Sequence, residues 1–131
     1  MKKANWIAAL LMTFALLAGC AGQEQQNAPG AAVETYLQAI VEGSEEKVAT
    51  VSCADWEETA RGEVASFAGV KARLDGLDCT ARSADGPETI VDCKGKIIAT
   101  YNNEDSDFPL EGRAYKVVQE GDEWRVCGYG E

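Results

Sequence analysis

The segment Val33-Glu34-Thr35-Tyr36-Leu37-Gln38-Ala39-Ile40-Val41-Glu42 has one apolar face, which the rest of the chain has to bury. Its apolar residues recur at the i, i+4, i+7, i+8 spacing of an amphipathic helix: Val33, Leu37, Ile40 and Val41. Gly43 follows directly, and glycine is a common residue just beyond a helix end. The segment therefore predicts a helix over 33–42 that buries one face against another layer of the protein.

Two more helical segments follow. Ser44 is placed to cap a short helix whose Val48 and Val51 face inward. Ser52 is placed to cap a third helix over Cys53–Phe67, with one apolar stripe: Cys53, Trp56, Ala60, Val64 and Phe67. The stripe is typical of a core face, although an aromatic box for a cofactor is the alternative.

The pattern from Val70 onward is that of strands. Four segments are rich in β-branched and aromatic residues, with turn signals between them: 70–83, 89–101, 110–119 and 123–129. Asp75-Gly76 interrupts the first and predicts a bulge or bend, and residues 102–107 predict a polar loop. Helices followed by a run of strands predict an α+β domain, with N-terminal helices packed on one side of a curved antiparallel sheet of about four strands.

An export signal precedes this domain. Lys2 and Lys3 come before an apolar run, 4–16, that is too short to span a bilayer. The run ends in Leu17-Ala18-Gly19-Cys20, which resembles the lipobox of bacterial lipoproteins. The resemblance implies that residues 1–19 are a signal peptide that is removed and that Cys20 receives a lipid.

The lipoprotein resemblance also implies a location. The lipid on Cys20 would anchor the chain at the extracytoplasmic face of a bacterial membrane, and Ala21 implies the outer membrane in a host with two. Residues 20–32, which hold Gly22, Pro29 and Gly30 and no apolar periodicity, predict a flexible tether. The predicted organisation is therefore signal peptide 1–19, anchor and tether 20–32, and folded domain 33–131.

The mature chain is strongly acidic. The full sequence has 22 acidic and 12 basic residues, and the signal peptide holds two of the basic and none of the acidic ones. The mature chain therefore carries ten basic residues and a formal charge of −12, which disfavours nucleic acid as a partner. Histidine is absent, which excludes Ser-His-Asp and Cys-His catalysis and imidazole metal sites.

Four cysteines remain once Cys20 is assigned to lipid, and an even number in an exported chain predicts two disulfides. They lack the Cys-x-x-Cys spacing of redox pairs and most zinc sites, although a four-cysteine zinc site is the alternative. Cys79 and Cys93 are equidistant from the turn near Gly86, so we expect them to pair across a hairpin.

This pairing leaves Cys53 with Cys127 and ties the helices to the last strand. Cys127 is out of phase with Trp124 and Val126 in strict strand alternation. The Cys53–Cys127 pair therefore requires a bulge near Gly128, or a helix that wraps around the sheet edge.

The order of elements is similar to that of the nuclear transport factor 2-like superfamily. Ala31–Ile40 (AAVETYLQAI) and Glu120–Val126 (EGDEWRV) carry the resemblance, which spans residues 31–129. It implies a cone-like sheet that wraps around helices and encloses a pocket. On this resemblance we expect eight residues to line the pocket: Tyr36, Leu37, Ile40, Trp56, Phe67, Ile97, Tyr101 and Trp124.

The superfamily holds both enzymes and binding modules, so the fold alone does not determine the function. A site of the ketosteroid isomerase type needs an acid beside a tyrosine. Tyr36 and Tyr101 are placed to face the pocket, but no acid maps there. Four acids of the predicted third helix lie off its apolar stripe: Asp55, Glu57, Glu58 and Glu63. Asp92 falls on the solvent face of its strand.

Residues 103–107 offer oxygen atoms at alternate positions, as at the start of a calcium loop. Phe108 and Ala114 occupy the positions where such a loop needs Gly and Glu. We therefore assign no catalytic residue, metal or cofactor from the sequence.

The sequence as a whole predicts a lipid-anchored, extracytoplasmic, non-catalytic domain that binds a small apolar ligand or a partner protein. The alternatives are a pocket-based isomerase or hydrolase, and an envelope-maintenance lipoprotein with no small ligand. A partly polar pocket that contains a buried acid favours an enzyme, whereas a filled core favours an interaction module.

Cys20→Ser tests the anchor. The thioether to lipid needs the Cys20 sulfur, so the variant should stay unprocessed or be released from membranes. Detergent phase partitioning after expression in a bacterial host measures this. A Cys20→Ser protein that partitions into detergent as the wild type does would exclude lipidation at this residue.

Overall fold

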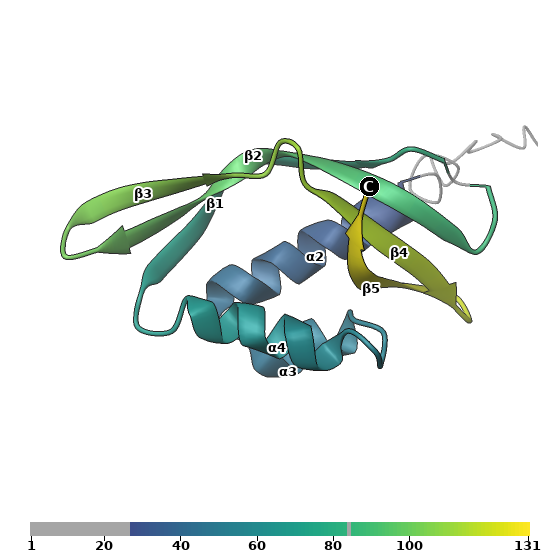
Figure 1. Ribbon diagram of the computed structural model, residues 1–131, viewed down its shortest axis with the longest axis horizontal. Helices are drawn as coiled ribbons and strands as arrows, with labels where there is room; N and C mark the ends of the chain where they lie inside the picture. The colour runs from purple at the N-terminus through teal and green to yellow at the C-terminus, as the bar shows by residue number, and fades with distance from the viewer. Residues whose placement is uncertain (1–26, 84) are drawn as a thin grey trace, which may run out of the picture.

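A computed structural model describes residues 27–83 and 85–131 and shows three helices packed beneath a five-stranded antiparallel sheet (Figure 1). The helices are α2 (Ala28–Glu42), α3 (Glu45–Thr50) and α4 (Glu57–Ser66). The strands are β1 (Lys71–Ala81), β2 (Glu88–Tyr101), β3 (Glu104–Pro109), β4 (Ala114–Glu120) and β5 (Glu123–Gly130). This is the α+β class that the sequence predicts, with one strand more than expected.

The predicted signal peptide 1–19, the lipidation residue Cys20 and the first part of the predicted tether, 21–26, lie outside the described residues. Within the described residues, no helix has the length and apolar character needed to cross a membrane.

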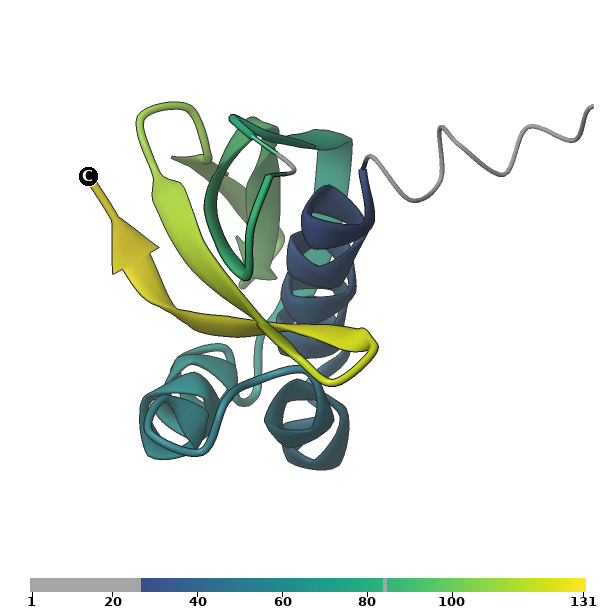
Figure 2. The same cartoon turned by 90° about the vertical axis from the view of Figure 1, so that its right-hand side faces the viewer.

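The longest strand, β2, organises the sheet. It pairs with β1 on one side and, on the other, with β4 through Glu88–Asp92 and with β3 through Lys96–Tyr101. β5 pairs with β4 and completes the sheet. The register of β1 shifts between Asp75 and Asp78, where the sequence predicts a bulge. The sheet curves around α2, with α3 and α4 on its open side (Figure 2).

The core lies between α2 and the sheet. The buried face of α2 is the one that the apolar spacing predicts, and it includes Val33, Tyr36, Leu37 and Ile40. The side chains that pack in the same cluster come from β2, β4, β5 and the turn before β4: Val91, Leu110, Tyr115, Val117 and Val126. Burial of this apolar surface is the main stabilising contribution to the fold.

The first described helix starts five residues earlier than the sequence predicts, at Ala28 in place of Val33. Pro29 stands in the first turn, where its fixed φ suits a helix and its missing N–H costs nothing. Gly30 is buried against β1, and a Cβ there would lie 2.3 Å from the carbonyl oxygen of Cys79. Residues 28–32 therefore belong to the domain, and the prediction that they form tether is wrong.

The predicted start of the third helix is also wrong, because α4 begins at Glu57 and not at Cys53. The Ser52 hydroxyl donates to the carbonyl of Val48 at 2.7 Å, so it does not cap α4. Residues 51–53 instead run beside β5, where the Val126 N–H donates to Val51 O at 2.8 Å and the Cys53 N–H donates to Val126 O at 3.0 Å.

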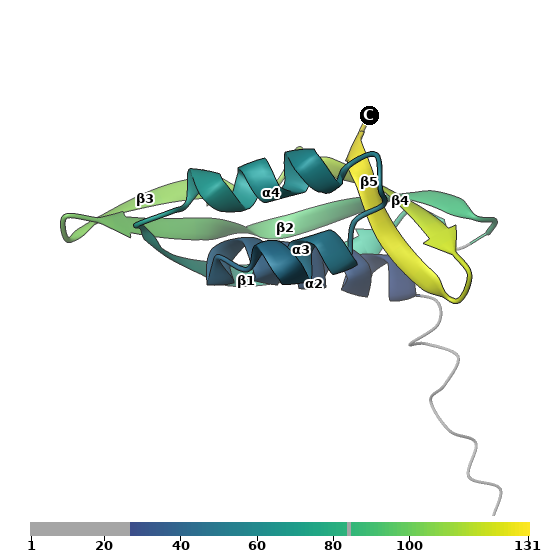
Figure 3. The ribbon, with the colours of Figure 1, turned by 90° about the horizontal axis from the view of Figure 1, so that it is seen from below.

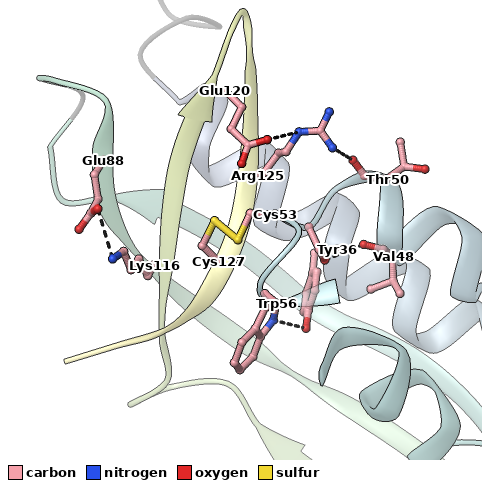
Figure 4. Close-up of a disulfide and its surroundings, with 11 residues drawn as sticks. Tyr36, Val48, Thr50, Cys53, Trp56, Glu88, Lys116, Glu120, Arg125 and Cys127 are labelled. Carbon is pink, nitrogen blue, oxygen red and sulfur yellow. Dashed lines mark hydrogen bonds and ion pairs between the residues drawn. A yellow bond between two sulfur atoms is a disulfide. The ribbon is translucent and has the colours of Figure 1, made fainter. Parts of the chain in front are cut away.

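Two disulfides join the cysteines in the pairs that the sequence favours. Cys79 and Cys93 are direct partners in the β1–β2 register, with Cα atoms 4.1 Å apart. Cys53 and Cys127 have Cα atoms 5.2 Å apart and link the segment before α4 to β5 (Figure 4). Cys127 is the extra residue of a bulge in the β4–β5 register, which places it out of the regular alternation.

The loop predicted over residues 102–107 is mostly strand. Asn102 and Asn103 have positive φ and make a two-residue turn, after which β3 pairs back onto β2. Two carboxylates of β3 face basic side chains of β1 and β2, with Arg73–Asp105 at 3.1 Å and Lys96–Asp107 at 2.6 Å. The strand predicted over 110–119 starts later than expected. The Arg113 N–H donates to Leu110 O in a turn, and β4 begins at Ala114.

Gly30→Ala should destabilise the protein, whereas Gly62→Ala should stabilise it. The first adds a Cβ against the Cys79 carbonyl, and we expect a loss of about 1–3 kcal/mol in the free energy of unfolding. The second adds a Cβ on α4 with nothing within 4 Å, and we expect a gain of about 0.5–1 kcal/mol. Urea unfolding measures both, and equal effects of the two changes would contradict the close packing of α2 on β1.

Candidate functional site

A cavity of about 250 Å³ lies between α2, α4 and the sheet. Its wall contains both apolar and polar residues. The apolar residues are Leu37, Ile40, Phe67, Ile97 and Phe108, and the polar group comprises Glu63, Ser66, Arg113, Tyr115 and Tyr129. An apolar cavity of about 150 Å³ is enough to bind benzene, so this one has room for a ligand of about ten non-hydrogen atoms.

Glu63 belongs to the polar group and is held from two directions. The Tyr36 hydroxyl, on α2, donates to Glu63 Oε2 at 2.8 Å, and the Tyr129 hydroxyl, on β5, donates to Oε1. Trp56 extends the network, because its indole N–H donates to the Tyr36 hydroxyl at 3.0 Å (Figure 4). The carboxylate therefore joins α4 to both α2 and the sheet. Figure 3 shows α4 running alongside α2 and α3, with the sheet behind them.

Aromatic rings surround this network. Tyr129 packs edge-on against Trp56, with ring centroids 5.4 Å apart, and lies 5.5 Å from Tyr115. Phe67 and Phe108 make a further edge-on pair at 6.0 Å, in the cavity wall. Such contacts fix ring orientation and present both ring faces and ring edges to the cavity.

Burial, followed by the charge on Glu63, raises the pKa of the Tyr36 hydroxyl well above its usual range. Burial and the hydrogen bond to Glu63 also raise the pKa of Tyr129 above its usual range. Both hydroxyls therefore remain protonated at physiological pH and act as donors to the carboxylate.

The charges at the cavity are not paired with each other. Among the described residues, neither Glu63 nor Arg113 forms a salt bridge. Glu63 is half-buried and satisfied by uncharged hydroxyl donors, whereas Arg113 is exposed at the cavity wall. The cavity thus offers one carboxylate and one guanidinium to a ligand.

The residues predicted to line the pocket have three different placements. Leu37, Ile40, Phe67 and Ile97 lie in the cavity wall. Tyr36 and Trp56 belong to the hydrogen-bond network around Glu63 and do not form the wall themselves.

The remaining two predictions, Tyr101 and Trp124, are wrong. Tyr101 is 65% exposed because it lies at the outer end of β2, in the hairpin with β3. Trp124 lines a separate hollow beside the start of α2, because its strand crosses the other end of the helix layer.

The prediction that no acid faces the pocket is also wrong, because Glu63 lines it. A helical signal for this residue exists in the sequence. Ala60, Glu63 and Phe67 follow the i, i+3, i+7 spacing of a single helix face. Glu63 lies beside the apolar stripe through Ala60, Val64 and Phe67, a position where an acid is usually expected to face solvent.

The sequence does not match any protein-family model or any curated protein. Solved structures are similar in fold. A proposed polyketide cyclase from Xanthomonas campestris pv. campestris has a TM-score of 0.57 at 11% identity, over 82% of this chain and 93% of that protein. A proposed dehydratase of the nuclear transport factor 2-like family from Streptomyces avermitilis has a TM-score of 0.52 at 14% identity, over 78% and 90%.

This chain has a nuclear transport factor 2-like fold. A proposed scytalone dehydratase from Novosphingobium aromaticivorans is similar as well, with a TM-score of 0.50 at 18% identity over 76% of each chain. At these identities the likeness establishes the nuclear transport factor 2-like architecture and leaves the function to be argued from the site.

Tyr36→Phe should destabilise the protein by about 1–3 kcal/mol, because it leaves the Trp56 N–H and one oxygen of Glu63 without their partner. Tyr101→Phe removes the same atom from an exposed position and should change the free energy of unfolding by less than about 0.5 kcal/mol. Urea unfolding of both variants makes the comparison. A Tyr36→Phe protein as stable as Tyr101→Phe would show that the network contributes nothing to stability.

Proposed function

We propose that this domain binds a small ligand with an apolar body in the cavity beneath the sheet, and that a lipid on Cys20 holds it at the outer face of a bacterial membrane. The observation that carries the ligand-binding proposal is the cavity of about 250 Å³, whose wall combines apolar residues with a few polar ones. Small-molecule sites are typically preformed, mostly apolar hollows with a few polar groups that fix the ligand's orientation.

The cavity favours ligand binding over the role of an interaction protein with no small ligand. Leu37, Ile40 and Ile97 are almost completely buried, yet they border open space. Further apolar side chains in that space would stabilise the fold by burying apolar surface, so the open hollow favours a site that a ligand fills. The hydrogen bonds on Glu63 also keep its carboxylate in place before any ligand arrives.

The membrane part of the proposal rests on the sequence around Cys20 and on where α2 begins. Seven residues, 21–27, separate Cys20 from the start of the helix at Ala28. Fully extended, these seven residues span about 24 Å at ~3.4 Å per residue, less than a tether that continued to residue 32 would allow. The domain would therefore stay close to the lipid headgroups.

Glu63 supports a second candidate, an isomerase or dehydratase that uses this carboxylate to accept a proton. A carboxylate beside protonated tyrosines in a pocket is a suitable arrangement for removing a proton next to a carbonyl group. Deuterium uptake by 2-indanone in D₂O, followed by NMR, tests this candidate. Uptake that is accelerated by the wild type and not by Glu63→Gln would support it, and equal uptake with both would exclude it.

A large side chain at Ser66 should block ligand binding. Ser66 lines the cavity from the end of α4, whereas its neighbour Ala65 is exposed and lies outside the cavity wall. We expect Ser66→Phe to weaken the binding of 2-indanol at least tenfold and Ala65→Phe to change it less than twofold.

Trp56 provides the readout in a Trp124→Phe background, because it is then the single tryptophan of the mature chain. Its ring contacts Tyr129 in the cavity wall, so its fluorescence should respond to a bound ligand. The protein is held in lipid nanodiscs, with empty nanodiscs as the blank. Absence of any 2-indanol response in the parent protein, or equal binding by both Phe variants, would contradict the proposed function.

A further inference from the structure

The carboxylate of Glu63 has hydrogen bonds but no counter-ion. Its two donors are the uncharged hydroxyls of Tyr36 and Tyr129, and no basic residue of the described chain pairs with it. A carboxylate has about four lone-pair positions, so two remain available to a ligand. A charged donor would bind more strongly there than an uncharged one.

The cavity wall around Glu63 also suits a positive charge. Tyr115 and Tyr129 line the cavity together with the carboxylate, as do Phe67 and Phe108. The faces of such rings attract cations within about 6 Å. The mature chain has a formal charge of −12, so its long-range field also draws cations and repels anions.

These observations point to one class of ligand, and we infer that the cavity takes a small amphipathic amine. The ammonium group binds at Glu63, between the aromatic rings, and the apolar body lies against Leu37, Ile40 and Ile97. The inference rests on the proposed function, because it assigns the polar end of the ligand in that same cavity.

Arg113 carries a positive charge at the same cavity, so it and Glu63 should have opposite effects on the binding of an amine. It lines the same cavity from the turn before β4, is exposed, and has no ion-pair partner among the described residues. Its positive charge weakens the binding of an ammonium ion and strengthens that of a carboxylate. Removal of Arg113 should therefore tighten amine binding, whereas removal of the Glu63 charge should weaken it.

Three probes that share one ring system separate the head groups: 2-aminoindane, 2-indanol and indane-2-carboxylate. Each is titrated at pH 7 into the mature protein in lipid nanodiscs, with empty nanodiscs as the blank. We expect 2-aminoindane to bind about tenfold more tightly than 2-indanol, because a charged donor binds a carboxylate more strongly than an uncharged donor does. Indane-2-carboxylate should bind most weakly of the three.

Two variants test the residues. Glu63→Gln keeps the shape of the side chain and should reduce the preference for the amine over the alcohol from about tenfold to less than twofold. Arg113→Gln should tighten 2-aminoindane binding by about twofold or more. A circular dichroism spectrum that matches the wild type shows that Glu63→Gln is folded.

Several results would overturn the inference. Equal binding of the amine and the alcohol by the wild type would leave the proposed function standing and exclude an ammonium site. Tightest binding of the carboxylate, lost in Arg113→Gln, would assign the head group to Arg113 instead. Failure of all three probes to bind would contradict both the inference and the proposed function.

Discussion

The attachment of residues 51–53 to β5 is the constraint on which the rest of the structure depends. Backbone hydrogen bonds join Val51 and Cys53 to Val126, and the disulfide to Cys127 lies beside them. Arg125 adds a further link, because its guanidinium donates to the carbonyl of Thr50 at 2.7 Å (Figure 4). A helical layer that would otherwise rest on the sheet through side chains alone is therefore fixed to it by the backbone.

The candidate site follows from this attachment. Cys53 is the last residue of the segment that is hydrogen-bonded to β5, and α4 begins four residues later, at Glu57. The attachment therefore fixes the position of α4 relative to the sheet. Glu63, almost two turns into α4, then meets Tyr129 on β5 and Tyr36 on α2. The three residues lie far apart in the sequence, and their contact exists only in the complete fold. A half-buried carboxylate also needs these donors, since a charge removed from water without partners is strongly destabilising.

The sequence predicts the features that depend on neighbouring residues. The apolar face of α2, its end at Gly43 and the bulge at Asp75-Gly76 all follow from spacing and from glycine chemistry, and the structure contains each of them. The features that it does not predict depend on distant contacts. Residues 28–32 look like a tether until Gly30 is placed against the Cys79 carbonyl, and residues 102–107 look like a polar loop until their acids face the basic side chains of β1 and β2.

The candidate site was predicted in part, for the same physical reason. Apolar wall residues such as Leu37, Ile40 and Ile97 repeat with the period of their element, so the sequence is enough to place them inward. For Glu63 the residue type favours solvent, because an acid is usually exposed, and its hydrogen bonds to two tyrosines explain its place in the cavity. Tyr115 and Tyr129 are cross-strand partners, a relation that requires the register of β4 and β5.

The central claim is that this fold holds a ligand between α2, α4 and the sheet. Methyl NMR of the mature protein in nanodiscs, during titration with 2-indanol, tests this claim most directly. The account predicts that saturable shifts concentrate on the methyl groups of Leu37, Ile40 and Ile97, which border the cavity. Leu77, on β1 in a separate hollow beside α2, should not shift. Shifts centred on Leu77, or no saturable shift at all, would contradict the claim.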